Sequence, residues 1–272
     1  MLTRAITGFF FIATIISAIY FGAYSAAFLF LVIVLLGVDE LFTMVKSSKT
    51  VHPLKIWGNL NGLVLISLAI PIAQQSLDAK FLAIPVAMLF FTFIIELYRK
   101  NEAPFLNISF TNLGVLYVVI PFAMLYHLGF YADYSFGKDF SYEIILGFFF
   151  ILWMNDTGAY LAGRFFGKHK LFERISPKKT WEGSLGGGIF SIGLAIIIAQ
   201  FFTNISLFDW IVISIIIVIF GGVGDLVESM LKRSLKIKDS GKLLPGHGGI
   251  LDRFDGLLIS APFVYCYLQL IS

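Results

Sequence analysis

A polar segment near the C-terminal end of the chain combines residues that bind metals with residues that bind phosphates. Asp225, Glu228, Ser229 and Lys232 recur at helical spacing, so they share one face of a helix. Acids within an apolar helix are costly and by default face a cavity or a partner. We therefore interpret Asp225 and Glu228 as candidate metal ligands, with Lys232 and Ser229 as candidate phosphate contacts. The alternative is a helix end whose acids pair with Lys232 and Arg233.

The loop that follows is rich in lysine and glycine. Lys238 and Lys242 are compact charges suited to phosphate oxygens, and the backbone amides of Gly248 and Gly249 can approach a ligand closely. His247 stands between glycines, where it could contact a phosphate or transfer a proton. The alternative is a flexible basic loop that touches anionic lipid headgroups.

Two more acids open the last apolar segment. Asp252 and Asp255 are three residues apart and lie on one helix face. Asp252 together with Asp225 would make a divalent-metal site from two helices, since magnesium prefers few carboxylates and leaves positions for water and substrate phosphates. Asp255 could instead cap the helix or pair with Arg253.

A second polar region lies earlier in the chain. We expect Asp156 to be buried at membrane depth and to serve as a further candidate ligand, as does Glu228. Ser176, Lys178, Lys179 and Thr180 precede a helix start and make a plausible triphosphate cradle. Trp181 could stack on a base, although anchoring at the membrane interface is the commoner role of tryptophan.

The elements that must position these residues are membrane helices. Of the 272 residues, 58% are hydrophobic and only 14% are charged, which indicates an all-α integral membrane protein. The single cysteine, Cys266, excludes an internal disulfide. A spanning helix needs about 20 apolar residues, and about nine segments qualify. They lie near 5–22, 26–45, 56–73, 80–98, 111–130, 142–163, 183–203, 207–231 and 251–271.

The positions of the basic residues predict the orientation. With nine spans, all of the 20 Lys and Arg residues except Lys80 and Lys138 fall on one side, together with the N-terminus. The positive-inside rule makes that side cytoplasmic. We expect one membrane domain over residues 1–272, with mainly lipid-facing helices over 1–140 and the site in 141–272.

These motifs resemble the signature of the phosphatidate cytidylyltransferases, also called CDP-diacylglycerol synthases. That signature begins with Ser229-Met-Leu-Lys-Arg233, continues with Lys238-Asp239 and ends with His247-Gly-Gly-Ile-Leu-Asp-Arg-Phe-Asp255. Every fixed position of the family pattern is present. The resemblance covers residues from about 153 to 256, and the segments 155–160 and 176–183 also look like family segments.

The resemblance implies that CTP and phosphatidate give CDP-diacylglycerol and pyrophosphate. Its implied cofactor is Mg²⁺, with Mn²⁺ as an alternative, and its implied partners are CTP, phosphatidate in the bilayer and membrane lipids, without nucleic acid. A homodimer stays open. Within this reaction Asp225, Asp252, Lys232 and His247 are the candidate catalytic residues. The resemblance and the short loops indicate a bacterial inner membrane, with the active site facing the cytoplasm.

Two other functions fit parts of the pattern. A transporter of protons or of an anionic solute would use the acids in the apolar segments as a relay, although the polar residues gather at one surface and no internal repeat is visible. A CTP-dependent lipid kinase would share the metal and the lysines but would transfer the γ-phosphoryl group. A purely structural subunit is the least favoured reading, given so many costly polar residues.

Overall fold

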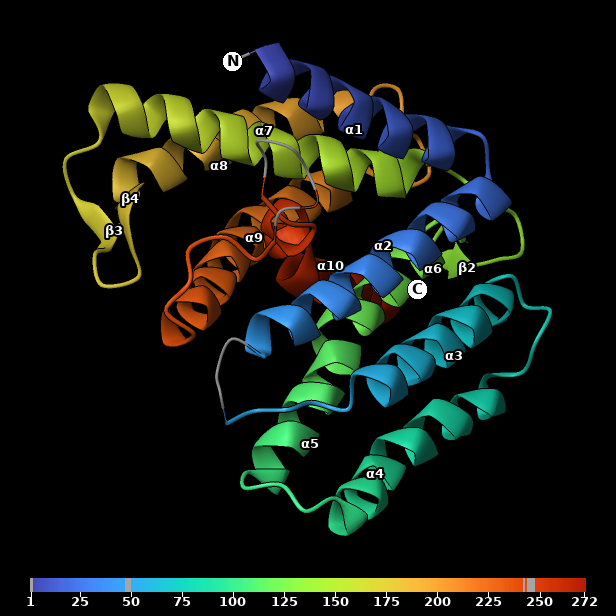
Figure 1. The fold of residues 1–272 in the computed structure, drawn as a ribbon. Coiled ribbons are helices and arrows are strands. Elements are labelled where there is room, and N and C mark those ends of the chain that lie inside the picture. Colours follow the sequence, from blue (N-terminus) through green and yellow to red (C-terminus); the bar gives the residue numbers. More distant parts are fainter. Residues whose placement is uncertain (1, 47–49, 242, 244–247) are drawn as a thin grey trace. The chain divides into compact units, whose positions relative to one another are not determined.

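The computed structural model describes residues 2–46, 50–241, 243 and 248–272, and its elements are almost entirely helices (Figure 1). Eight helical segments of the described chain are long and apolar enough to cross a membrane. A shorter apolar stretch, Ile6–Tyr20, lies in the first helix, where the first of the nine spans was predicted near 5–22. The expectation of an all-α polytopic membrane protein is confirmed.

The chain divides into two compact units. The first comprises residues 1–127 and 234–253, and the second comprises 128–233 and 254–272. The segment that carries Asp252 therefore belongs with the N-terminal helices, whereas Asp225 belongs to the second unit. The single membrane domain with a division near residue 140 stays a prediction.

The first unit is made of helices connected by short loops. They are α1 (Leu2–Tyr20), α2 (Ala23–Val45), α3 (Lys55–Ala73), η1 (Ala79–Leu82), α4 (Ala83–Tyr98), α5 (Pro104–Leu113), the π-helical turn η2 (Gly114–Val119) and α6 (Ile120–Leu128). Gly22 links α1 to α2 with a φ of 116°, a backbone conformation that only glycine adopts readily.

Helix α2 is the centre of the first unit. The ring of Phe42 fills the space over Gly58 of α3 and Gly114 of η2, where a Cβ atom at either glycine would overlap it. Phe30 packs against Phe122 and Tyr126. Half or more of the α2 span is buried inside the protein, against 17% of the span that contains α4, so α4 presents most of its surface to its surroundings.

A buried carboxylate joins the loops at one end of this unit. Glu96 at the end of α4 is 1% exposed and accepts hydrogen bonds from Arg99 at 2.7 Å and from Asn107 of α5 at 2.7 Å. Asn107 in turn accepts the backbone N–H of His52 at 2.6 Å. Because charge-assisted bonds are the stronger ones, this network fixes the connections around α4.

The second unit contains four long helices and two short hairpins. Strands β1 (Tyr131–Ala132) and β2 (Ser135–Phe136) pair antiparallel, as do β3 (Lys170–Phe172) and β4 (Ser176–Thr180). The helices are α7 (Glu143–Phe166), α8 (Trp181–Ile198), α9 (Leu207–Ser234) and α10 (Leu251–Ile271), of which α10 enters this unit at Phe254.

A buried carboxylate also joins separate elements of the second unit. Asp209 in the first turn of α9 is 5% exposed and accepts hydrogen bonds from the hydroxyls of Tyr134 at 2.9 Å and Tyr267 at 2.7 Å. The Ser206 hydroxyl donates to the same carboxylate at 2.5 Å. These contacts join the β1–β2 hairpin, α9 and the end of α10.

Helices α7 and α8 pack closely because small residues line their contact (Figure 1). A Cβ atom on Gly187 would lie 2.6 Å from the side-chain oxygen of Asn155 and 2.8 Å from its carbonyl oxygen. A Cβ atom on Gly183 would lie 2.9 Å from the carbonyl oxygen of Ala159, and one on Gly186 would overlap the Cβ atom of Ala162. Close approach of backbones at small residues is a common way to associate membrane helices.

We expect Gly187→Ala to lower the apparent free energy of unfolding by about 1–3 kcal/mol, because the methyl group must push the α7 backbone away. Thermal unfolding in detergent measures the change. Gly193→Ala is the matched control, because Gly193 lies on the same helix with nothing within 4 Å of its would-be Cβ. Equal unfolding temperatures for the two variants would contradict this account of the α7–α8 packing.

Candidate functional site

Helix α9 meets α10 through glycines, and this contact places the acids of the second unit. A Cβ atom on Gly224 would overlap the carbonyl oxygen of Asp255, and one on Gly221 would lie 3.2 Å from Leu152 and 3.9 Å from the carbonyl oxygen of Gly256. The backbones therefore approach where Asp225 follows Gly224 on α9. Any larger residue at position 224 would separate Asp225 from Asp255.

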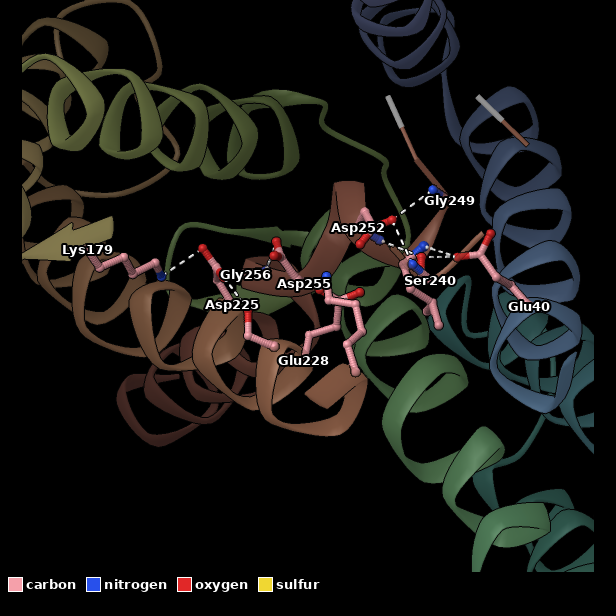
Figure 2. A network of polar contacts seen from close by, with 12 residues as sticks. Glu40, Lys179, Asp225, Glu228, Ser240, Gly249, Asp252, Asp255 and Gly256 are labelled. Carbon is pink, nitrogen blue, oxygen red and sulfur yellow. Dashed lines mark hydrogen bonds and ion pairs between the residues drawn. The ribbon is translucent and has the colours of Figure 1, made fainter. Parts of the chain in front are cut away.

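Asp225 pairs with a lysine from the other polar region. Its Oδ2 lies 2.7 Å from Nζ of Lys179, which also donates to the carbonyl oxygen of Gly222 at 3.2 Å (Figure 2). The Ser229 hydroxyl donates to Oδ1 of Asp225 at 3.3 Å. The carboxylate is 40% exposed, so it stays accessible to a ligand. Three of the predicted site residues are thus brought together.

Glu228 and Lys232 form a separate ion pair one turn further along α9. Nζ of Lys232 lies 2.5 Å from Oε2 of Glu228, and their side chains are 11% and 0% exposed. Removing one partner would leave a buried charge uncompensated, so the pair is structurally important. The alternative reading, acids paired along their own helix, describes Glu228 but does not describe Asp225.

Asp255 completes an acidic group around this site. Its Oδ1 accepts the backbone N–H of Gly256 at 2.7 Å, and Asp225 and Glu228 lie near its carboxylate (Figure 2). The negative charge of Asp156 also acts on this carboxylate. Asp156 is exposed at the surface of α7, so the expectation that it is buried is wrong. It lies on a face of α7 that the protein leaves uncovered, yet it still contributes to the field at Asp255.

The predicted phosphate cradle forms a strand that leads into α8. Ser176 opens β4 and is half-buried, Lys178 is exposed, and Lys179 reaches Asp225. Oγ1 of Thr180 accepts the backbone N–H of Gly183 at 3.1 Å and so caps the N-terminus of α8. Trp181 is 56% exposed, as an interface anchor would be.

In the first unit, Asp252 belongs to a compact hydrogen-bonded loop. Its Oδ2 accepts the backbone N–H groups of Ser240 at 3.0 Å and Gly249 at 2.9 Å (Figure 2). Gly248 has a φ of 85°, and a Cβ atom there would lie 2.5 Å from the same oxygen. The amide of Gly249, predicted to bind substrate, is thus directed at Asp252 in this structure.

Glu40 of α2 holds the same loop from the other side. Its carboxylate accepts the Ser240 hydroxyl at 2.6 Å and the backbone N–H groups of Ile250 and Leu251, each at 2.9 Å. The sequence predicts only a structural or supporting role for Glu40, which lies at the end of an apolar segment, and Ser240 stands out only because it follows Lys238-Asp239 of the signature. Their mutual contact, across 200 residues, has no local signal.

The other predicted residues divide as follows. Lys238 and Arg233 are exposed. His247 and Lys242 lie outside the described residues, so their roles stay predictions. Asp225 and Asp252 belong to different units, and their sharing of one metal ion also stays a prediction.

The chemistry of the donors decides whether a metal would fit. Carboxylate oxygens are the ligands that magnesium prefers, and Asp225, Asp255 and Asp156 supply them from α9, α10 and α7. Within the described part of the chain, no three His, Cys, Asp or Glu residues are already drawn together as a metal-binding group. The carboxylates thus have the chemistry that a hard divalent cation prefers, and binding of such a cation would require Asp225 to turn from Lys179.

Fold and site together define an α-helical integral membrane protein whose acids and lysines are suited to phosphate chemistry. The chain belongs to the cytidylyltransferase family, whose model matches residues 2–271. The phosphatidate cytidylyltransferase of Staphylococcus haemolyticus is 38% identical over 236 residues, which cover 85% of this chain and 84% of that protein. That of Staphylococcus epidermidis is 37% identical over 233 residues, with coverage of 85% and 84%.

We expect Thr180→Ala to destabilise the protein by about 1 kcal/mol, because the first turn of α8 loses its capping oxygen. Thr180→Ser keeps the oxygen and is the matched control. Apparent unfolding temperatures in detergent compare the two variants. If the alanine and serine variants unfold at the same temperature, the hydroxyl does not act as a cap.

Proposed function

We propose that this protein transfers the cytidylyl group of CTP to phosphatidate, giving CDP-diacylglycerol and pyrophosphate. The observation that carries the proposal is that a family match over nearly the whole chain coincides with a carboxylate–lysine site at Asp225 and Lys179. The relatives carry the name of this activity, and the chain matches them over most of their length. The protein is accordingly a nucleotidyltransferase.

In the proposed reaction, a phosphate oxygen of phosphatidate attacks the α-phosphorus of CTP. A new P–O bond forms there, and the bond from the α-phosphorus to the oxygen bridging to the β-phosphate breaks, so that pyrophosphate leaves with its electron pair. The attacking oxygen is already anionic near neutral pH, so no strong base is needed. The main obstacle is the repulsion between two anionic substrates.

The residues of the chain would lower this repulsion. Lys178 is exposed and Lys179 is one quarter exposed, so both can reach phosphate oxygens. When a phosphate takes Lys179, the carboxylate of Asp225 becomes available for another cation. Bound Mg²⁺, or Mn²⁺, would supply charge neutralisation at the phosphates, with Asp225 and Asp252 as the proposed ligands and Asp156 and Glu228 as further candidates. His247 would contact the leaving pyrophosphate.

The location is part of the proposal. With the nine predicted spans, all Lys and Arg residues except Lys80 and Lys138 would fall on the side that the positive-inside rule makes cytoplasmic, where CTP is available. The active site would therefore face the cytoplasm at a bacterial inner membrane, while the acyl chains of phosphatidate remain in the bilayer. A homodimer stays open.

The first test identifies both products. Purified protein in detergent micelles receives phosphatidate and CTP labelled at the α-phosphate, with and without Mg²⁺. We expect label in a lipid product and metal-dependent release of pyrophosphate. CDP together with a phosphorylated lipid would identify a lipid kinase instead, and the absence of any nucleotide-dependent product would return attention to transport.

We expect Asp225→Asn and Asp252→Asn each to lower kcat by about 100-fold or more, because each would remove a proposed ligand of the divalent cation that neutralises the reacting phosphates. Turnover of folded, purified variants is the measurement. Glu173→Gln is the control, because it neutralises an exposed acid on the turn between β3 and β4. Normal turnover of either Asn variant would remove that aspartate from the site.

We expect Lys178→Ala to raise the KM for CTP with a smaller change in kcat, because an exposed lysine contributes mainly to binding of the nucleotide. Initial rates at varied CTP measure both constants. Lys170→Ala, which removes another exposed lysine of the same hairpin, is the control. An unchanged KM with a lower kcat would place Lys178 at the transition state instead.

A further inference from the structure

The carboxylate of Glu40 is the centre of the loop that carries Asp252. Oε1 accepts the Ser240 hydroxyl at 2.6 Å and the Leu251 backbone N–H at 2.9 Å, while Oε2 accepts the Ile250 N–H at 2.9 Å. Ile250 and Leu251 stand at the start of α10, where backbone N–H groups lack partners within the helix. Glu40 therefore caps α10 from a different helix, with its negative charge at the positive end of the helix dipole.

Ser240 transmits this contact to Asp252. Its hydroxyl donates to Glu40 and accepts the backbone N–H of Asp252 at 3.3 Å, while its own backbone N–H donates to Oδ2 of Asp252 at 3.0 Å. Ser240 is 7% exposed, so water has little access to replace these bonds. Ser240 thus links Glu40 to the Asp252 carboxylate, in addition to the direct contacts of Glu40 with Ile250 and Leu251.

Two glycines show how closely the loop is fitted to this carboxylate. A Cβ atom on Gly241 would lie 2.5 Å from Oε2 of Glu40, and one on Gly249 would overlap both Oε1 of Glu40 and Oγ of Ser240. Gly241 and Gly249 can lie this close to the Glu40 carboxylate only because both positions lack a side chain. Ile250 and Leu251, which are 6% and 1% exposed, enclose it further.

From this geometry we infer that Glu40 is a positioning residue for the reaction: its carboxylate holds Ser240, Ile250 and Leu251 in place, so that Asp252 presents its carboxylate for binding of a divalent cation. The inference rests on the proposed function for its catalytic consequence. The contacts of Glu40 with Ser240, Ile250 and Leu251, here called the Glu40 clamp, lie within the first unit alone.

The neighbouring acid provides a natural contrast. Asp39 lies next to Glu40 on α2 and pairs with Lys55 at 2.6 Å, with its side chain 47% exposed. A surface ion pair of this kind contributes little. Asp39→Asn and Glu40→Gln make the same chemical change one residue apart, and only Glu40→Gln replaces an acceptor oxygen by an NH₂ group that faces backbone N–H donors.

The first experiment measures the clamp directly, without substrate or metal. Amide hydrogen exchange in detergent is followed for the peptide that contains Ile250 and Leu251. We expect Glu40→Gln to speed exchange there by about tenfold or more, because hydrogen bonds to a charged acceptor are lost. Asp39→Asn should match the wild type. Equal exchange in all three proteins would overturn the inference.

The second experiment measures turnover of the same variants over a range of Mg²⁺ concentrations. Loss of a group that orients a metal ligand commonly lowers metal affinity or activity by about 10–100-fold. We expect Glu40→Gln to raise the Mg²⁺ concentration for half-maximal activity by this factor, with excess Mg²⁺ restoring much of kcat. A loss that Mg²⁺ does not restore, together with a lower unfolding temperature, would show a merely structural role.

Ser240→Ala provides a second test of the inference if the Glu40 variant does not fold. It removes the relay while leaving the Glu40 charge, so we expect the same shift in Mg²⁺ requirement and little further effect when combined with Glu40→Gln. Fully additive effects would overturn the relay. If the wild type forms no CDP-lipid, the proposed reaction fails, while the exchange comparison still decides whether Glu40 clamps the loop.

Discussion

The structure depends on the high free energy of a charge left without a partner in an apolar environment. Glu96, Asp209 and Glu228 are each buried, and each has a partner that donates to it: Arg99 and Asn107 for Glu96, two tyrosines and a serine for Asp209, and Lys232 for Glu228. Glu96 and Asp209 join separate elements at the ends of helices, whereas Glu228 pairs within α9. Charge is therefore concentrated where helices end and loops meet, which is also where a polar substrate can arrive.

Asp225 differs from these acids in a way that matters for function. Its partner, Lys179, comes from the segment before α8 and is itself partly exposed, as is the carboxylate. Such a pair is less costly to separate than the buried pair of Glu228 and Lys232. A phosphate ligand can compete for Lys179, whereas Glu228 and Lys232 are buried against each other and are less accessible to a ligand. Two ion pairs less than two turns apart on one helix thus have different roles.

Glycine acts as the second organising feature because it lets polar groups meet at backbone distance. Gly224 brings the acids of α9 and α10 together, and Gly249 lets the loop close around Glu40. In both places the neighbour of the glycine is an oxygen atom, from a carbonyl group or a carboxylate. The glycines of the site are therefore needed for its internal geometry, independently of any contact between their amides and substrate.

The sequence alone determined the class of fold and the residue types of the site. Composition and the lengths of the apolar segments predict the spans, because the thickness of the bilayer imposes a length of about 20 residues on each helix. The charged residues of 225–255 stand out because they lie between apolar segments, where charges are costly unless they bind a partner. The expectation for Asp156 failed because hydropathy places a residue along a helix but does not tell which face the protein covers.

Only the tertiary structure decided which polar groups are partners. The pairing of Asp225 with Lys179 spans 46 positions and that of Glu40 with Ser240 spans 200, and neither follows from a helical or strand period. Local patterns report the periodicity of a backbone, whereas these contacts depend on how helices pack through small residues. That packing is a property of the folded chain and gives the signature residues their separate roles.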